Sequence, residues 1–257
     1  MLSPRSILML ARNDLRQRFR GAVIGRLWLV MTPLISLLLY SLVFSTIFQA
    51  RWKFMSADAY TDYAMVLFPG LMMHQLLIEV LVKGANAFDA YAGITSKLNI
   101  GFLDLVLGSA LGSLIQFWMA LAVWYPVAIW YFGISLSGLL MVLACLGLFA
   151  IFCVGLMLLS AVIGSLAKDW QQIISMLGMG LLFVSPILYP VTNLPIGIQG
   201  VVAVNPLTHY INAIRQGAFE PSLTFSFSLI GDCLGMAAIA IALGFWLQGV
   251  TSRFAND

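Results

Sequence analysis

The chain has 257 residues, of which 61% are hydrophobic and 9% are charged, with a formal net charge of +3 and a mean hydropathy of +0.99. Soluble domains carry roughly 25% charged residues, so this composition excludes a soluble enzyme and predicts an all-α integral membrane protein with several spans. The sequence interleaves no basic and aromatic residues in a way that would favour nucleic-acid binding, so that class is excluded as well.

Residues 1–26 predict an amphipathic helix that lies along the cytoplasmic surface of the membrane. Ser3-Pro4 is typical of a helix start, with proline at the first helical position. Apolar side chains then recur at helical spacing, at Leu8, Ala11, Leu15 and Phe19. Such a stripe with basic residues beside it indicates a helix at the membrane interface.

Three arginines of this helix, Arg12, Arg16 and Arg20, fall beside the apolar stripe. One interpretation is that they anchor the helix to anionic headgroups. A second, compatible with the first, is that they hold the phosphate or pyrophosphate of a lipid-linked substrate, because guanidinium groups suit bidentate phosphate contacts. Asp14 is expected to pair with Arg18 one turn further on.

Residues 27–250 predict six membrane spans. The apolar runs are Leu27–Phe48, Ala64–Val82, Leu105–Phe132, Leu139–Leu166, Ile173–Leu188 and Leu229–Val250. The first run is too long for the apolar part of a signal peptide, and no cleavage site follows it, so we expect it to remain as a membrane anchor. Residues 1–257 are thus expected to form a single transmembrane domain.

Between the last two spans, residues 191–222 predict a re-entrant region on the outer side. Its apolar run Ile196–Val204 has nine residues, whereas a helix needs roughly 20 to cross the bilayer. Prolines break the chain on both sides of this run. Irregular backbone at membrane depth is tolerated only where protein or a watery cavity surrounds it, so the segment suggests a lined path.

The distribution of Lys and Arg predicts that both chain termini are cytoplasmic. With that orientation ten basic residues face the cytoplasm: Arg5, Arg12, Arg16, Arg18, Arg20, Arg26, Lys83, Lys97, Lys168 and Arg253. Only three, Arg51, Lys53 and Arg215, lie outside. The expected location is the bacterial inner membrane.

Few ionisable residues fall in or near the spans. Glu79 and Lys83 are one turn apart, so we expect an ion pair between them. Asp104 and Asp232 lie near span ends and are expected to be solvated, and Arg215 is expected to face water or headgroups on the outer side. Neither histidine has the neighbours of a nucleophile and base pair. The three cysteines show no metal-ligand spacing, so no metal and no catalytic residue is expected.

Aromatic residues are a further candidate for substrate contact. Tyr40, Phe44 and Phe48 lie one turn apart along the first span, and Phe183 and Tyr189 lie on the fifth. An aligned aromatic stripe can stack on sugar rings. Ordinary packing and interfacial belts explain the same pattern.

No segment outside the spans is long enough for a nucleotide-binding domain, which needs roughly 150 residues. The inner loops at residues 84–101 and 166–172 are short, and no G-x-x-x-x-G-K-[ST] phosphate loop occurs. Energy for any work must therefore come from a partner.

Together, several motifs make the chain resemble the ABC-type polysaccharide-export permeases. They are Arg12-Asn-Asp-Leu-Arg-Gln-Arg-Phe19, Gly25-x-x-Trp28-x-x-x-x-Pro33, Tyr40-Ser-Leu-Val-Phe-Ser45, Ile47-Phe48, Phe68-Pro-Gly-Leu71, Gly84-Ala-Asn-Ala-Phe88, Ser185-Pro-Ile-Leu-Tyr-Pro190, Leu194-Pro195, Asn205-Pro-Leu207 and Arg215. The motifs follow the family's order and cover essentially the whole chain.

The resemblance implies a homodimeric channel with two copies of a separate cytoplasmic ATPase, which would bind ATP and magnesium, so no cofactor is expected in this chain. It places the first and fifth spans, with the segment after Tyr189, along the sugar path. It assigns the coupling to the ATPase to the two inner loops, with Asn86, Phe88, Lys97, Lys168 and Asp169 as candidates. The family's usual Arg-Asp pair is Lys168-Asp169 here, and His74 replaces its usual tryptophan.

The expected function is therefore export of a lipid-linked polysaccharide, of O-antigen or capsule type, across the membrane. An exporter of drugs or lipids with the same fold is the first alternative. An intramembrane transferase or protease is the second, and it would need a catalytic cluster that the sequence does not contain.

Overall fold

In a computed structural model the described residues are 3–47, 51–53, 60–87, 90, 101–191, 194–219 and 227–254, and nearly all of them are helical. The helices are α1 (Pro4–Arg18), η1 (Gly25–Leu27), α2 (Trp28–Tyr40), the π-helix η2 (Ser41–Ile47), α3 (Tyr63–Ala85), α5 (Phe102–Phe132), α6 (Leu136–Leu166), α7 (Trp170–Val184), α8 (Ile196–Val204), α9 (Pro206–Phe219) and α10 (Phe227–Phe254). The predicted helical class is confirmed.

Within the described ranges, four helices are long and apolar enough to cross a membrane. They are Gly25–Phe44, Tyr63–Ala85, Phe102–Trp130 and Leu136–Leu166. Two further apolar helices, Trp170–Val184 and Ile230–Trp246, are shorter. The first four predicted spans thus lie in helices long enough to cross, while the full count of six crossings stays a prediction.

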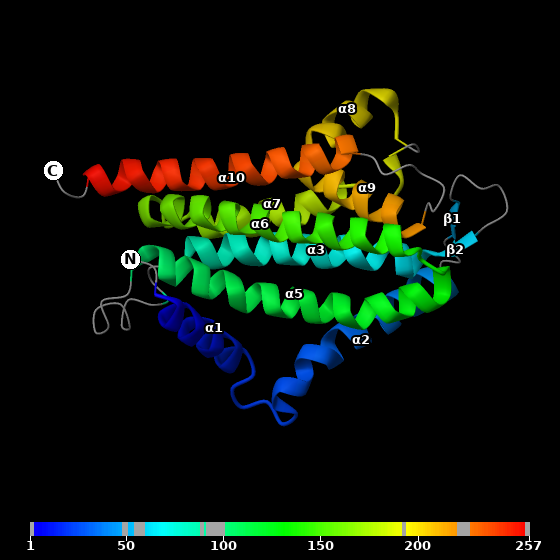
Figure 1. Cartoon of the computed structure of the whole chain (residues 1–257), viewed down its shortest axis with the longest axis horizontal. Helices are drawn as coiled ribbons and strands as arrows, with labels where there is room; N and C mark the ends of the chain where they lie inside the picture. Colours follow the sequence, from blue (N-terminus) through cyan, green and yellow to red (C-terminus); the bar gives the residue numbers. More distant parts are fainter. Residues whose placement is uncertain are drawn as a thin grey trace.

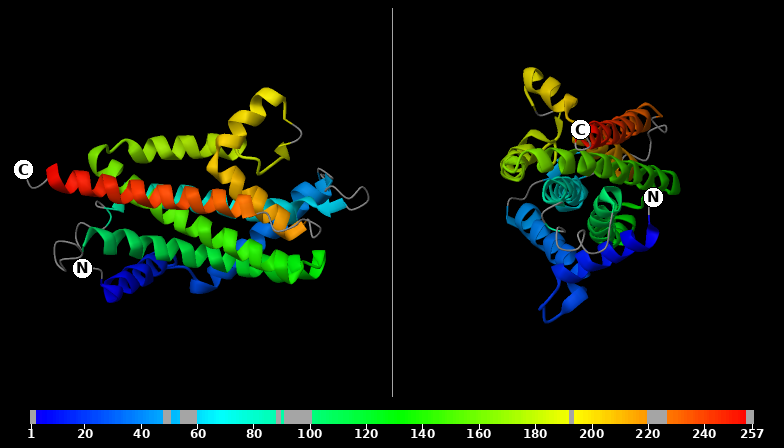
Figure 2. Two further views of the ribbon diagram at one scale, coloured as in Figure 1. Left: turned by 45° about the horizontal axis from the view of Figure 1, so that its top comes forward. Right: turned by 90° about the vertical axis from the view of Figure 1, so that its left-hand side faces the viewer.

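The long helices α3, α5, α6 and α10 lie side by side, with α6 packed against α10, α3 and α9 (Figures 1 and 2). The helix α1 and the end of α10 lie at one end of this bundle. The opposite end carries α8, α9 and a small hairpin (Figure 1). The helical part of the chain therefore begins and ends at the same end of the bundle. This agrees with an even number of membrane crossings.

Small residues let α6 approach its neighbours closely. A Cβ added at Gly164 would meet the backbone of Ala85 on α3, and one added at Gly155 would lie 2.6 Å from the backbone of Ala240 on α10. Helices in a membrane associate mainly through such close packing, because lipid is as apolar as the side chains. The glycines of α6 therefore fix which helices surround it.

The centre of the bundle is rich in aromatic side chains, two of which donate hydrogen bonds to backbone carbonyls. Tyr210 of α9 packs edge-on against Phe149, with ring centroids 5.1 Å apart, and donates a hydrogen bond of 2.7 Å to the carbonyl of Cys233. Trp124 donates from Nε1 to the carbonyl of Met65 at 3.0 Å. The three cysteines, Cys145, Cys153 and Cys233, are free and buried, as small apolar residues would be.

The helix α1 packs along α5, a contact that was not predicted from the sequence. Leu10 and Ala11 are buried, whereas Leu8 is 63% exposed. Gly108 and Gly112 of α5 make this contact possible, because a Cβ at either position would collide with Leu10 or with the Asp14 side chain. The exposed Leu8 does not contradict the predicted stripe, which was expected to face the membrane surface, and that expectation stays a prediction.

Two local features were not predicted from the sequence. The first span continues beyond α2 as the π-helix η2, a form that occurs often at functional sites. A short antiparallel hairpin follows, in which β1 (Arg51–Lys53) pairs with β2 (Tyr60–Asp62) in the register Arg51 to Asp62. The predicted aromatic residue Phe48 lies outside the described residues.

The segment between α7 and α9 contains α8 with the predicted bounds, Ile196–Val204. Asn205 then separates α8 from α9, and its Oδ1 accepts a hydrogen bond of 3.0 Å from the backbone N–H of Leu207. Thr208 donates to the carbonyl of Val202 at 2.7 Å. These bonds fold α9 back against α8, as a segment that enters the membrane and returns to the same side would require. The depth of this segment in a membrane stays a prediction.

Candidate functional site

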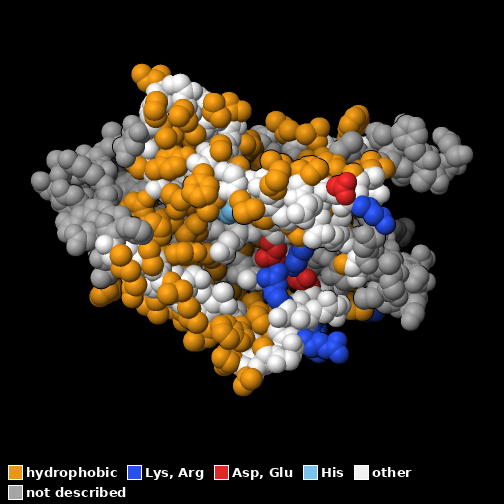
Figure 3. Space-filling view, turned by 180° about the vertical axis from the view of Figure 1, so that it is seen from behind, with side chains coloured by type: hydrophobic (Ala, Val, Ile, Leu, Met, Phe, Trp, Pro, Cys, Tyr) orange, Lys and Arg blue, Asp and Glu red, His pale blue; other side chains and the backbone are white. Residues whose placement is uncertain are grey.

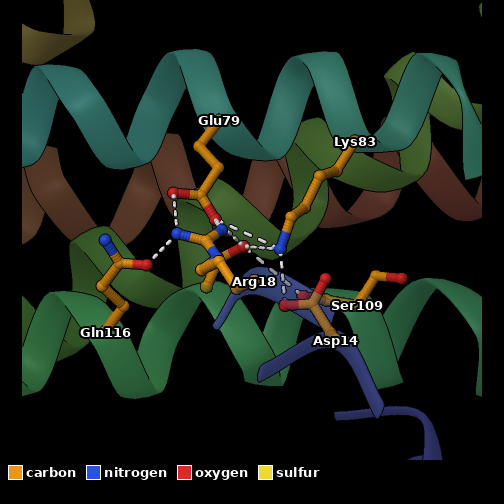
Figure 4. A network of polar contacts seen from close by, with 7 residues as sticks. Asp14, Arg18, Glu79, Lys83, Ser109 and Gln116 are labelled. Atoms are coloured by element: carbon orange, nitrogen blue, oxygen red, sulfur yellow. Dashed lines mark hydrogen bonds and ion pairs between the residues drawn. The ribbon is translucent and has the colours of Figure 1, made fainter. Parts of the chain in front are cut away.

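A cluster of charged and polar side chains joins three helices at the side of the bundle. Its members are Asp14 and Arg18 of α1, Glu79 and Lys83 of α3, and Ser113 and Gln116 of α5. Each helix contributes two residues on one face, three or four positions apart. Figure 4 shows most of them in one group, with Arg18 and Lys83 pointing toward the acidic side chains. We call these six residues the polar cluster.

Every charge in the polar cluster has an opposite charge beside it. Arg18 forms an ion pair with Glu79 and a hydrogen bond to Gln116. Lys83 Nζ lies 2.7 Å from Asp14 Oδ2 and 3.2 Å from Glu79 Oε1, and it donates to Ser113 Oγ at 3.0 Å. Between 13% and 25% of each charged side chain is exposed. The charges of the two cations and the two anions therefore cancel at a site that is mostly shielded from solvent.

The predicted ion pair between Glu79 and Lys83 is confirmed. The predicted pair between Asp14 and Arg18 was wrong, because each of the two residues pairs with α3 instead. Both project from α1 toward the bundle, where stronger partners on another helix are within reach. Isolated charges at membrane depth are costly and are rare unless paired, so the cluster ties α1 to α3 and α5.

A small cavity of about 40 Å³ adjoins the cluster. Its lining mixes hydroxyl and amide side chains, such as Thr32, Gln75 and Gln116, with apolar ones, such as Met72 and Phe117. A cavity needs roughly 10–15 Å³ to hold one water, so there is room for a few water molecules. On the face shown in Figure 3, basic and acidic side chains gather among widespread hydrophobic ones.

The three predicted phosphate-binding arginines lie away from the polar cluster. Arg12 and Arg16 are exposed on α1 and Arg20 is exposed in the turn after it, whereas Arg18 turns into the bundle. Arg18 therefore has a structural role, whereas the other three arginines remain accessible to solvent. Spacing shows why within the helix, because Arg12 and Arg16 are four residues apart along one stripe, while Arg18 shares another face with Asp14.

The predicted aromatic stripe of the first span is partly used in packing. Phe44 stacks on Tyr63 of α3 with ring centroids 5.4 Å apart, and Tyr40 packs against the core. Tyr63 donates a hydrogen bond to the carbonyl of Leu188, which connects this stripe to the segment after α7. Phe183 is 65% exposed, and Tyr189 donates to its carbonyl. Of these side chains, Phe183 has the largest free surface.

Arg215 was expected to face water or headgroups, and this was wrong, since it is only 7% exposed. Its guanidinium donates to the carbonyl of Pro186 at 2.6 Å and to that of Ile187 at 2.8 Å. Asn205 donates from Nδ2 to Ser185 Oγ at 2.8 Å. The prolines after α7 leave carbonyls without helical partners, and Arg215 satisfies two of them, so it fixes the chain where α7 ends.

Asp104 was also expected to be solvated, but it is 4% exposed and accepts a hydrogen bond of 3.0 Å from the backbone N–H of Ser3. It thereby holds the start of α1 against α5. Asp232 is exposed, with His209 Nδ1 at 3.8 Å. His74 Nε2 donates to the carbonyl of Gly178 at 2.9 Å, which connects α3 to α7.

Of the coupling candidates, Asn86 ends α3, where its Nδ2 donates to the carbonyl of Val82 at 2.9 Å. Lys168 and Asp169 are exposed in the short connection between α6 and α7. Phe88 and Lys97 lie outside the described residues. Among the residues that are described, no group of three or more His, Cys, Asp or Glu side chains could hold a metal ion.

Comparison with known proteins adds the family context. Residues 5–219 match the family described as ABC-2 type transporter. The chain is 20% identical to an O-antigen export system permease protein RfbA of Klebsiella pneumoniae, over 97% of this chain and 93% of the relative. It is 21% identical to a polysialic acid transport protein KpsM of Escherichia coli, over 84% of this chain and 82% of the relative. An RfbA permease of Myxococcus xanthus is 20% identical over 92% and 87% of the two chains.

Proposed function

The chain belongs to the ABC-2 type transporter family, and from this membership we propose that it is the transmembrane subunit of an ATP-driven exporter of lipid-linked polysaccharide. The observation that carries the proposal is that relatives named for O-antigen export and for polysialic acid transport align along most of its length. The cargo would be a glycan of O-antigen or capsule type. The chain itself would perform no chemistry.

ATP hydrolysis would come from a separate cytoplasmic ATPase, because the sequence contains no phosphate loop and no domain that could hold one. We expect two copies of the ATPase beneath a homodimer of this chain. The exposed Lys168 and Asp169, with Asn86 at the end of α3, are the candidates for contact with it. Both chain ends would then face the cytoplasm, and the membrane would be the bacterial inner membrane.

The transport path would lie along the face of α3 between α2 and α7. Large apolar side chains on both flanking helices are exposed, such as Leu38 and Leu39 on α2 and Met179 and Phe183 on α7. Between them α3 exposes Gln75, which also lines the small cavity beside the polar cluster. In a homodimer Leu38 and Leu39 would meet the second copy or lipid, and Gln75 with the exposed ring of Phe183 would face the glycan.

The deciding experiment is the location of lipid-linked polysaccharide in cells that lack this protein. We expect finished glycan to accumulate on the cytoplasmic side and surface glycan to be lost, with recovery when the chain is supplied again. A normal surface coat together with altered sensitivity to small toxic compounds would instead favour a drug or lipid exporter of the same family.

A further inference from the structure

The connection between α1 and α2, residues 19–27, projects away from the bundle. Figures 1 and 2 show α1 and α2 as the two arms of a V, with the connection at its apex and at the edge of the molecule. The connection ends in the short helix η1, which packs mainly on α2. We call residues 19–27 the α1–α2 turn.

Backbone hydrogen bonds within the α1–α2 turn hold its shape. The N–H of Ala22 donates to the carbonyl of Phe19 at 3.2 Å, and the N–H of Gly25 donates to the carbonyl of Ala22 at 3.1 Å. Gly21 and Gly25 have φ angles of 81° and 54°, a region that residues with a side chain rarely adopt. The two glycines therefore allow a tight reversal whose apex is formed by the residues between them.

The apex of the turn is apolar and exposed. Val23 is fully exposed, Ile24 is 43% exposed, and Leu27 just beyond the apex is 62% exposed. Turns that face water are usually built from Gly, Pro, Asn, Asp and Ser. A group of exposed apolar side chains on a projecting turn is instead typical of a surface that contacts a membrane or another protein.

The apolar apex continues an exposed apolar face of the first span. Leu27, Met31, Leu34 and Leu38 are exposed at intervals of three or four residues, so they share one side of the helix. This helix is one of those long and apolar enough to cross a membrane. The turn lies where that helix begins, which is the level of the lipid headgroups for a membrane span.

The charge around the apex is positive. Arg20 and Arg26 are exposed on its two sides. Asp14 is the one acidic residue among residues 3–47, and it is 13% exposed and paired with Lys83. No acidic side chain of α1, α2 or the turn therefore opposes these two arginines. Exposed apolar side chains with basic residues beside them are typical of segments that bind anionic membranes.

We propose that the α1–α2 turn binds the headgroups of anionic phospholipids. Arg20 and Arg26 contact the lipid phosphates, and Val23 and Ile24 lie among the upper parts of the acyl chains. Long arginine side chains can reach the headgroups from such a position. The bound lipids fix the depth at which the first span begins. The inference does not rest on polysaccharide export, since it requires only that α2 lies in a membrane.

The connection between α5 and α6 provides a matched control. It also contains a glycine with positive φ, Gly133 at 62°, and an exposed apolar residue, Leu136 at 71%. The sequence from 105 to 167, which includes this connection, contains no Lys or Arg. Leu136 therefore has the exposure of the apex without the arginines beside it.

The experiment compares two lipids around one labelled residue of the full chain in nanodiscs. The three native cysteines are buried, so a thiol-reactive fluorophore can be attached at Val23→Cys or at Leu136→Cys. Phosphatidylglycerol and phosphatidylcholine each carry a spin label at the same upper position of the acyl chain and quench the fluorescence of a nearby label. The nanodiscs contain no polyisoprenyl lipid, so a response comes from phospholipid and not from a lipid-linked substrate.

At residue 23 we expect phosphatidylglycerol to associate about fivefold more strongly than phosphatidylcholine, equivalent to the ~1 kcal/mol of one basic residue near an anionic surface. At residue 136 the two lipids should quench equally. Arg20→Gln with Arg26→Gln should remove the preference at residue 23, and Arg20→Lys with Arg26→Lys should keep it. An increase in ionic strength from about 0.1 M to about 1 M should weaken it, because the Debye length falls from about 10 Å to about 3 Å.

Three results would overturn the inference. The first is equal quenching by the two lipids at residue 23. The second is an absence of quenching by either lipid there, which would place the turn against a protein partner or a second copy. The third is an equal preference at residue 136, which would show a general effect of membrane charge. The comparison of the two cysteine positions decides even if the double Gln variant does not accumulate.

The proposed function can fail separately. Complete surface glycan in cells without this chain would reject polysaccharide export and would leave the lipid preference at residue 23 unaffected. Equal quenching at residue 23, together with lost surface glycan in cells without the chain, would reject only the binding of anionic lipid by the turn.

Discussion

Arg18 of α1 forms an ion pair with Glu79 of α3, 61 residues further along the chain. The pair connects α1 to the bundle, and the neighbouring pair of Asp14 with Lys83 does the same one turn away. An ATPase partner would act on the chain from its cytoplasmic end. A rigid connection at that end would transmit a movement of α1 to α3.

Removal of one member of the pair should destabilise the protein more than removal of both. Glu79→Gln leaves Arg18 without its carboxylate at a mostly buried place, and we expect a loss of about 1–3 kcal/mol, below the fully buried range because a quarter of each side chain is exposed. Removal of both charges, in Arg18→Gln with Glu79→Gln, should recover part of it. Thermal unfolding in nanodiscs measures each variant, and strictly additive losses would reject the coupling.

The exposed arginines of α1 should affect transport and not stability. The triple change of Arg12, Arg16 and Arg20 to Gln should abolish export while insertion and unfolding stay within about 0.5 kcal/mol of the parent, as is usual for surface positions. Surface glycan and membrane protein level are the readouts. Normal surface glycan in this variant would remove phosphate recognition from these residues.

Gly108→Leu should push α1 away from α5. A Cβ at Gly108 would lie 3.1 Å from the carbonyl oxygen of Ile7 and would also collide with Leu10, and overpacking of this kind costs about 1–3 kcal/mol. With the native cysteines replaced, Leu10→Cys should react slowly with a thiol reagent and become reactive in the Gly108→Leu background. Gly147→Leu is the control, because a Cβ at Gly147 would meet no atom within 4 Å, and slow reaction in both backgrounds would contradict the close contact.

Arg215→Leu should destabilise the segment between α7 and α8. The change leaves the carbonyls of Pro186 and Ile187 without their donor, and each unsatisfied buried group costs about 1–3 kcal/mol. Arg215→Lys should recover only part, because an ammonium group lacks the fork that reaches both oxygens. Limited proteolysis of the outer region and thermal unfolding would report the change. Arg26→Leu is the control, because Arg26 is exposed. An equal loss of stability in that variant would show that Arg215 has no special role.

The two groups of aromatic residues should respond differently to substitution by Ala. Phe44→Ala removes the stack on Tyr63 and should cost stability of about 0.5–1.5 kcal/mol beyond the lost burial. Phe183→Ala removes an exposed ring and should lower export several-fold with little change in unfolding. Measurement of surface glycan and of unfolding in both variants separates packing from contact with sugar. Unchanged export in Phe183→Ala would exclude that ring from the glycan path.

The amino-acid sequence determined the features that depend on neighbouring residues. It was sufficient for the membrane class, for the positions of the apolar helices and for the bounds Ile196–Val204 of α8. The ion pair of Glu79 with Lys83 was also predicted, because both residues lie on one helix, one turn apart. Hydropathy and helical spacing are local properties, so they can be read along the chain.

The tertiary structure alone decided which side of each helix meets which neighbour. Leu8 is exposed and Leu10 buried, Asp14 and Arg18 pair with α3, and Arg215 is enclosed by the segment after α7. The polar cluster is likewise formed by three helices that are distant in sequence. In a membrane protein the side that faces lipid is as apolar as the side that faces protein, so hydrophobicity cannot distinguish the two, and only the contacts between helices settle where each side chain points.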